Sequence, residues 1–184
     1  MLVLASLSPR RRELLGLIRS DFAVIEPHAD ETPPPGLSPE DIVQALALRK
    51  AQSLMPSYPD DTLIGADTLV ALDGRVLGKP EDEAMAAAML RSLSGREHAV
   101  YTGVALVHNK EQTCFCQKTL VQFRPLTDRD IASYIQTGEP MDKAGSYGIQ
   151  GKAAAFVSGI VGDYYTVVGL PVCALAQRLT ALGV

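Results

Sequence analysis

Asp67 is the residue whose type and position most clearly indicate chemistry. It lies between the apolar segments 62–66 and 69–72, so it interrupts an apolar pattern that otherwise predicts one buried strand. A buried carboxylate is costly unless it is paired, hydrogen-bonded or bound to a metal. The alternative is a structural aspartate that caps a turn or pairs with an internal arginine. Because acids in perturbed surroundings concentrate at functional sites, we favour a catalytic role for Asp67.

The segment 6–12, with the sequence SLSPRRR, predicts a helix start that binds an anion. Ser8 is a good N-cap residue, and Pro9 suits the first helical position. The free N–H groups at a helix start attract anions and disfavour cations, so Arg10 and Arg11 at this end indicate a bound anion among them. A solvated basic patch is an equally good interpretation of this segment taken alone.

Two further segments carry candidate ligand-binding residues. Lys79 precedes a predicted helix over 80–93, again at the end of a helix that favours anions. The segment 142–151, DKAGSYGIQG, is rich in glycine, which allows a backbone to approach a ligand closely. Taken singly, these segments favour a solvent-exposed loop over a functional one, as do the isolated residues Lys50 and Glu31.

Composition restricts the class of protein. A chain of 184 residues with 47% hydrophobic residues suits one globular domain, with two lobes around a cleft. No apolar run approaches the roughly 20 residues that span a bilayer, and the N-terminus lacks the plan of a signal peptide, so we expect a cytoplasmic protein without membrane contact. Three cysteines without a C-x-x-C pair, and three scattered histidines, argue against a zinc site.

Charge restricts the partners. The net charge is −4 and no long basic stripe is present, which argues against general nucleic-acid binding. An acidic protein binds a polyanion through a focused basic pocket or through bridging cations. The charge balance therefore favours a metal-assisted site.

The hydrophobic patterns predict alternating strands and helices, and hence an α/β fold with a mixed sheet. Two hairpins are expected, the second turning at Val161 and Gly162. Strands are expected over 1–5, 22–25, 62–72, 75–77, 99–107, 113–123, 153–160 and 164–168. Helices are expected over 10–18, 38–54, 80–93, 127–138 and 171–182.

Six segments together resemble the Maf family of nucleotide pyrophosphatases, once described as septum-formation inhibitors. Each is weak alone, but they occur in the family's order, cover nearly the whole chain and are highly specific together. Leu7, in place of a smaller or polar residue, and the segment 152–153 depart from the family pattern. The matching segments are SxSPRRxELL at 6–15, GADT at 65–68, GKP at 78–80, LSG at 93–95, GEPxDKAGxYGIQG at 138–151 and VVGLP at 167–171.

The resemblance implies a single domain over 1–184. Its fold would be a mixed twisted sheet with flanking helices and two lobes around a cleft, similar to the inosine triphosphate pyrophosphatases. The implied reaction is the hydrolysis of a nucleoside triphosphate to the monophosphate and pyrophosphate, with Mg²⁺ or Mn²⁺ as the cofactor. The implied assembly is a homodimer.

The resemblance also implies the substrate. The family branch that acts on dTTP and UTP has Arg, Thr and Gln at the positions of Arg10, Thr68 and Gln150, whereas the branch that acts on 7-methyl-GTP has Trp, Gln and Glu. The Gln150 amide offers a donor and an acceptor, which suits the imide edge of a pyrimidine. Substrate-binding residues are therefore expected at Ser6, Arg10, Arg11, Lys50, Thr68, Lys79 and Gln150.

The role of Asp67 stays open at this stage. The resemblance implies a general base that activates water, but a metal ligand, together with Glu31, is equally compatible with the sequence. Two other functions also stay open. One is a nucleotide-binding regulator of cell division with little turnover, and the other is the same chemistry on 7-methyl-GTP or on a modified pyrimidine nucleotide.

Overall fold

The computed structural model describes residues 1–184, which divide into two compact units. The first unit comprises Met1–Thr68, Thr102–Gln117 and Gly169–Val184, and the second comprises Leu69–Tyr101 and Lys118–Val168. Three long strands, β3, β5 and β6, each pass from one unit into the other along the chain. This division does not test the prediction of a single domain, which stays a prediction.

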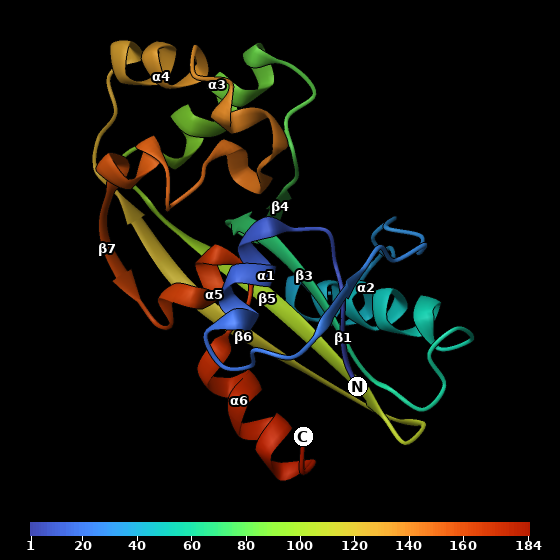
Figure 1. Cartoon of the computed structure of the whole chain (residues 1–184). Helices are drawn as coiled ribbons and strands as arrows, with labels where there is room; N and C mark the ends of the chain where they lie inside the picture. Colours follow the sequence, from blue (N-terminus) through green and yellow to red (C-terminus); the bar gives the residue numbers. More distant parts are fainter. The chain divides into compact units, whose positions relative to one another are not determined.

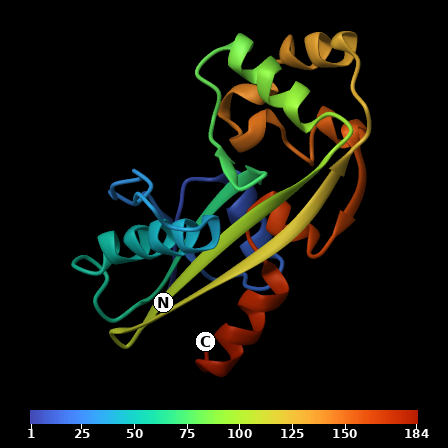
Figure 2. The same cartoon turned by 180° about the vertical axis from the view of Figure 1, so that it is seen from behind.

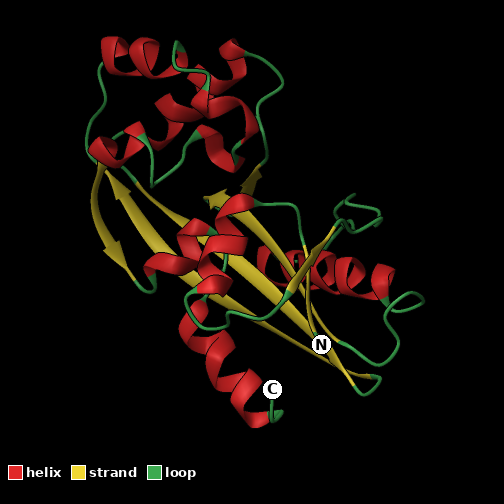
Figure 3. Ribbon diagram, viewed as in Figure 1, coloured by secondary structure: helices red, strands yellow, loops and turns green.

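A mixed sheet of seven strands, with helices flanking it, confirms the predicted fold class (Figure 3). Its order is β2-β1-β3-β5-β6-β7, and β4 pairs with β3 outside this path. β1 runs parallel to β2 and β3, whereas the pairs β3–β4 and β6–β7 are antiparallel. The strands are β1 Leu2–Ala5, β2 Ala23–Ile25, β3 Thr62–Leu72, β4 Arg75–Leu77, β5 Glu97–His108, β6 Glu111–Phe123 and β7 Val157–Val161.

The helices begin where the sequence supplies a cap. Ser8, Ser38, Asp82 and Thr127 each accept a hydrogen bond from a backbone N–H in the first turn of the helix that follows. The α-helices are α1 Pro9–Gly16, α2 Pro39–Leu54, α3 Glu83–Leu93, α4 Asp128–Ile135, α5 Tyr164–Val168 and α6 Val172–Ala181. Three 3₁₀ segments follow α4, namely η1 Glu139–Asp142, η2 Ala144–Ser146 and η3 Lys152–Phe156.

The first unit is built on β1, whose four residues are all buried. In Figures 1 and 2, α1 and α6 lie on one face of the strands of this unit, and α2 lies on the other. Ala47 and Ala51 of α2 pack with Val3, Ala5 and Leu63 in one apolar cluster. The small side chains of α2 therefore allow the helix to lie close to the sheet.

The second unit has an aromatic core. Phe123 and Tyr147 pack edge to face with a centroid distance of 4.8 Å, and the buried His98 packs against both rings. Helices α3 and α4 of this unit lie side by side in both views (Figures 1 and 2). The core thus joins β5 and β6 to the segment that precedes Gln150.

The predicted second hairpin is wrong. Residues 153–156 belong to the 3₁₀ segment η3, β7 pairs with β6, and residues 164–168 form the helix α5. The reason is Asp163, whose carboxylate accepts hydrogen bonds of 2.7 Å from both the backbone N–H and the hydroxyl of Thr166. This cap favours a helix over the strand that the β-branched residues predict.

The predicted start of α3 is also wrong. The helix begins at Glu83, after the N-cap Asp82, and not at Pro80. Lys79 therefore lies in the preceding loop and not at a helix start. The three cysteines are free, and no helix is both long and apolar enough to cross a membrane.

Candidate active site

Asp67 is paired with a buried lysine. Lys50 of α2 is 6% exposed, and its Nζ lies 2.7 Å from Asp67 Oδ1 and 2.9 Å from Glu31 Oε1. The interpretation of Lys50 as a surface cation is therefore wrong, and the partner of Asp67 is a lysine and not an arginine. One ammonium group between two carboxylates leaves this cluster with a net negative charge.

Two glycines bring Lys50 to Asp67. A Cβ on Gly65 of β3 would lie 2.0 Å from the carbonyl oxygen of Ala47, and a Cβ on Gly103 of β5 would lie 2.4 Å from that of Val43. Both carbonyls belong to α2, so the helix backbone almost touches the two strands. Any side chain at Gly65 or Gly103 would push α2, and Lys50 with it, away from the strands.

Arg11 is fixed by hydrogen bonds to three different parts of the first unit. Its Nε donates to the carbonyl of Gly169 at 2.9 Å, its Nη2 to Thr68 Oγ1 at 3.1 Å and its Nη1 to Ser6 Oγ at 3.4 Å. The guanidinium therefore ties the start of α1 to β3 and to the turn before α6. Thr68 Oγ1 also shares a hydrogen bond of 2.9 Å with Thr102 Oγ1, which is buried on β5.

The charges around Arg11 influence one another. Burial lowers the pKa of the Arg11 guanidinium below its ordinary value, and the Asp67 carboxylate opposes this shift. Arg10 lowers the pKa of Arg11 further, whereas Glu31 raises it. The first unit thus brings Arg10, Arg11, Asp67 and Glu31 into one electrostatic neighbourhood.

The start of α1 has the predicted cap. Ser8 Oγ accepts from the backbone N–H of Arg11, and Ser6 Oγ accepts from the backbone N–H of Ser8 at 3.2 Å. Ser6 is buried, whereas Arg10 is half-buried and its side chain makes no hydrogen bond or ion pair. Arg10 therefore remains available to a ligand, as does the exposed Arg12.

Lys79 and Gln150 belong to the second unit. The two segments that carry them are joined by a hydrogen bond of 3.0 Å from the N–H of Gly145 to the carbonyl of Gly78. Gly145 has a φ of 68° and lies against Val70, so a side chain at this position would be both strained and crowded. The side chains of Lys79 and Gln150 are exposed and make no hydrogen bond or ion pair.

Sequence reasoning missed two polar residues that support these positions. Thr102 forms a hydrogen bond with Thr68. The sequence feature that could have identified it is a hydroxyl side chain next to Gly103 in an otherwise apolar strand. Glu139 binds backbone and side-chain donors around Gln150, and its signal is its place in the segment 138–151, which contains the other family residues of this region.

Asp67 and Glu31 are chemically suited to a divalent cation. Their carboxylates already converge on one cation, the Lys50 ammonium, and Mg²⁺ in phosphate-ester enzymes is held by one or two carboxylates plus substrate phosphate oxygens. The structure contains no group of three or more His, Cys, Asp or Glu side chains arranged to hold a metal ion. A metal here would therefore depend on few protein ligands and on the substrate.

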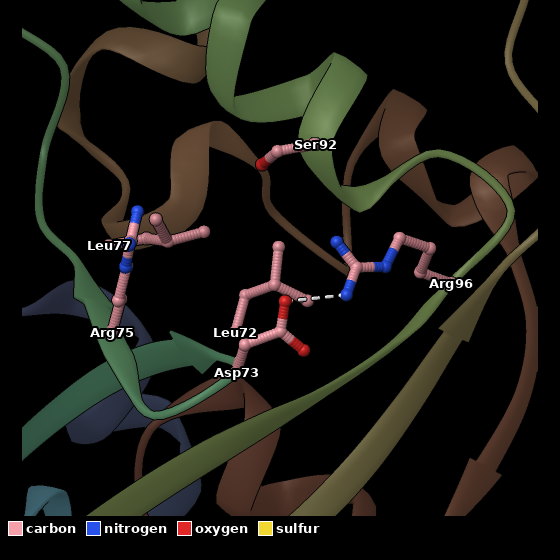
Figure 4. A pocket seen from close by; sticks show the side chains of 6 residues that line it. All are labelled: Leu72, Asp73, Arg75, Leu77, Ser92 and Arg96. Carbon is pink, nitrogen blue, oxygen red and sulfur yellow. Dashed lines mark hydrogen bonds and ion pairs between the residues drawn. The ribbon is translucent and has the colours of Figure 1, made fainter.

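A separate pocket of about 440 Å³ lies in the second unit (Figure 4). Arg75 and Arg96 lie on opposite sides of Leu72, and Arg96 forms an ion pair of 2.6 Å with Asp73. The lining is completed by Leu77 and Ser92. None of the predicted site residues lines this pocket.

The architecture and the charged cluster together define an α/β protein with a preformed polar site beside buried strands. Comparison with known families is more specific. The model of the family described as Maf-like protein matches residues 1–182, and the chain belongs to this family.

Relatives with assigned names match over nearly the whole chain. A dTTP/UTP pyrophosphatase of Symbiobacterium thermophilum is 52% identical over 182 residues, which are 99% of this chain and 94% of the relative. A dTTP/UTP pyrophosphatase of Geobacillus sp. (strain WCH70) is also 52% identical, over 99% of this chain and 98% of the relative. That of Pelotomaculum thermopropionicum is 50% identical, over 99% and 96%.

Among solved structures, the chain is similar to the Ham1 protein of Staphylococcus aureus. The TM-score is 0.48 at 18% sequence identity, over 66% of this chain and 71% of the other.

Proposed function

We propose that this chain is a nucleoside triphosphate pyrophosphatase that hydrolyses dTTP and UTP to the monophosphate and pyrophosphate. The observation that carries the proposal is the ion pair of the buried Lys50 with the partly buried Asp67 beside Arg11, within a family whose relatives at about half identity are named dTTP/UTP pyrophosphatase. A regulator with little turnover and an enzyme for 7-methyl-GTP are not favoured by these names.

Asp67 acts as the general base in this proposal. Lys50 donates to Oδ1 and no hydrogen bond engages Oδ2, so Oδ2 is the oxygen that takes the proton of the attacking water. The water oxygen bonds to the α-phosphorus, the bond from that phosphorus to the bridging oxygen breaks, and pyrophosphate leaves with the bonding electrons. Lys50 fixes the rotamer of Asp67 and keeps the carboxylate oriented.

The triphosphate is bound by positive groups that the fold leaves available. Arg10 binds phosphate oxygens with its guanidinium and with its backbone N–H in the first turn of α1, and Lys79 adds a charge on the second unit. Arg11 contributes its charge, but its three hydrogen bonds assign it chiefly to holding Ser6 and Thr68 in place.

Asp67 and Glu31 are the residues that would hold a divalent cation in the proposed site. When bound, Mg²⁺ or Mn²⁺ neutralises phosphate charge and lowers the pKa of water. Lys50 would keep both of these carboxylates directed at one position.

The base is read by Arg10, Thr68 and Gln150 in this proposal. The exposed Gln150 amide offers both a donor and an acceptor to the imide edge of thymine or uracil. A site built to pair that edge rejects a base that leaves its polar groups unpaired. Discrimination against cytosine, whose edge has a different pattern of donors and acceptors, is the expected consequence.

The test is a product assay on the purified chain. Each of the common ribo- and deoxynucleoside triphosphates is supplied with Mg²⁺ or Mn²⁺, and monophosphate and pyrophosphate are quantified separately. We expect dTTP and UTP to be the best substrates, with no activity after exhaustive chelation and recovery when the metal is restored. Release of single phosphates, or equal turnover of all nucleotides, would contradict the proposal.

The homodimer and the cytoplasmic location stay predictions. Light scattering at micromolar protein concentration measures the oligomeric state directly. A monomer mass there would contradict the dimer and leave the proposed reaction unaffected.

A further inference from the structure

The loop that carries Gln150 is held on both sides by one carboxylate and one tyrosine. Glu139 Oε2 accepts from the backbone N–H of Lys152 at 3.1 Å, and the hydroxyl of Tyr134 accepts from the N–H of Gly148 at 3.1 Å. The same hydroxyl donates to Glu139 Oε1 at 2.8 Å. Glu139 and Tyr134 thus connect the residues two before and two after Gln150.

Gly151 shows how closely the carboxylate approaches the loop. A Cβ at this position would lie 2.1 Å from Glu139 Oε1 and 2.4 Å from Oε2. The carboxylate therefore occupies the space that a side chain at position 151 would need. The glycine, and not a general need for flexibility, lets Glu139 reach the backbone of the loop.

Tyr134 is suited to this double role. The residue is 3% exposed, and burial raises the pKa of its hydroxyl above the ordinary value, as does the nearby Glu139 carboxylate. The hydroxyl therefore keeps its proton at neutral pH and donates it to Glu139, while its oxygen accepts from Gly148.

The Gln150 side chain has no such support of its own. It is exposed and makes no hydrogen bond, so its place depends on the backbone on either side. Both oxygens of Glu139 are used on that backbone and on Tyr134, and Glu139 forms no ion pair. The arrangement resembles a support for one loop more than a general contribution to the core.

We propose that Glu139, with Tyr134, is a positioning residue for nucleotide selectivity, because the two hold the 148–152 loop in the conformation from which Gln150 reads the base. This inference rests on the proposed function. It concerns the ratio of activities toward different bases and not the chemical step, which takes place at Asp67.

The variants are Glu139→Gln and Tyr134→Phe. An amide at position 139 directs an NH₂ group at one of two donors, and phenylalanine at position 134 removes the shared hydroxyl. Each loss of a hydrogen bond is worth about 1 kcal/mol, or roughly a fivefold change. We expect the ratio of kcat/KM for dTTP to that for dCTP to fall by about fivefold or more in each variant.

The matched control is Asp130→Asn. Asp130 forms the capping box of α4 in the same unit and pairs with Arg124, and its hydrogen bonds and ion pair do not involve the 148–152 loop. It should lower the melting temperature and leave the dTTP to dCTP ratio unchanged. Inhibition by inorganic tripolyphosphate, which has no base, should be the same in wild type and all variants.

The outcomes separate the two proposals. A wild-type enzyme selective for dTTP, with folded Glu139→Gln and Tyr134→Phe variants that keep its ratio, would overturn the positioning role alone. A ratio that changes equally in Asp130→Asn would also overturn it, because the effect would then follow stability. A wild-type chain that releases no pyrophosphate from any nucleotide would overturn the proposed function, and this inference with it.

Discussion

The two units hold their candidate functional side chains in different ways. In the first unit most of these side chains are themselves fixed, since Lys50, Asp67 and Arg11 all form hydrogen bonds or ion pairs, and Arg10 is the exception. In the second unit the side chains of Lys79 and Gln150 are exposed, and only the backbone around them is held. Groups that do chemistry need a fixed geometry, whereas groups that meet a substrate from a loop need a fixed backbone.

Asp67→Asn is the strongest test of this difference between the two units. The amide keeps the size of the side chain but is a far weaker base, so we expect kcat to fall by about 10²–10⁴-fold. The matched control is Asp73→Asn, which removes an exposed carboxylate paired with Arg96 and should retain full activity. Pyrophosphate release by both variants is the measurement, and an Asp67→Asn variant with more than about a tenth of wild-type turnover would exclude Asp67 as the base.

Gly65→Ala tests how the first unit fixes Lys50. The added methyl group would clash with the backbone of α2 at Ala47, and overpacking of this kind costs about 1–3 kcal/mol. We expect a lower melting temperature and a loss of turnover together. Gly16→Ala, where nothing lies within 4 Å of the added Cβ, is the control and should change neither. Normal stability and activity of Gly65→Ala would show that α2 can move without consequence.

Arg11→Lys and Arg10→Lys separate a fixed arginine from an available one. A lysine at position 11 cannot form the three hydrogen bonds to Gly169, Thr68 and Ser6, so we expect a loss of both stability and activity, by roughly tenfold in kcat/KM. Arg10→Lys should weaken the binding of the nucleotide with an unchanged melting temperature. Equal melting temperatures for the two variants would contradict the distinction.

His98 gives the smallest effect, on stability alone. Burial lowers the pKa of His98 from 6.5 to about 4, so between these pH values the unfolded chain binds a proton that the folded chain does not. Stability therefore falls as the pH drops from 6.5 toward 4. His98→Gln, which keeps a polar group near Tyr147, should show a smaller decrease in melting temperature over this range. Parallel curves of melting temperature against pH for the variant and the wild type would refute the assignment of this pH dependence to His98.

The sequence was most informative where local signals act alone. The caps Ser8, Ser38 and Thr127 mark true helix starts, and the apolar pattern around Asp67 marks a true strand. The prediction fails at 153–168, where β-branched residues indicate strands but the Asp163 cap and the pairing of β7 with β6 decide the structure. The pairing of β7 with β6 has no local signal, whereas the Asp163 cap is a local signal that the pattern of β-branched residues obscured.

In the candidate site, too, local features could be predicted from the sequence and tertiary contacts could not. The sequence indicates which residues are chemically suited, and in the structure Lys50 pairs with both Asp67 and Glu31. It does not show that Lys50 is buried, because that depends on two glycines of different strands allowing α2 to approach. Nor does it show Glu139 supporting the 148–152 loop, because a glutamate in a polar segment has no pattern that distinguishes it from a solvated one.

The central claim is that Asp67 performs the chemistry on every nucleotide, whereas Gln150 reads the base. The most direct test is the ratio of kcat/KM for dTTP to that for dCTP, measured in Asp67→Asn and in Gln150→Glu. Glutamate offers only acceptors when ionised, so it no longer matches the imide edge of thymine. We predict that Asp67→Asn lowers both activities and keeps the ratio, and that Gln150→Glu lowers the ratio. A ratio that changes in Asp67→Asn and stays constant in Gln150→Glu would contradict the account.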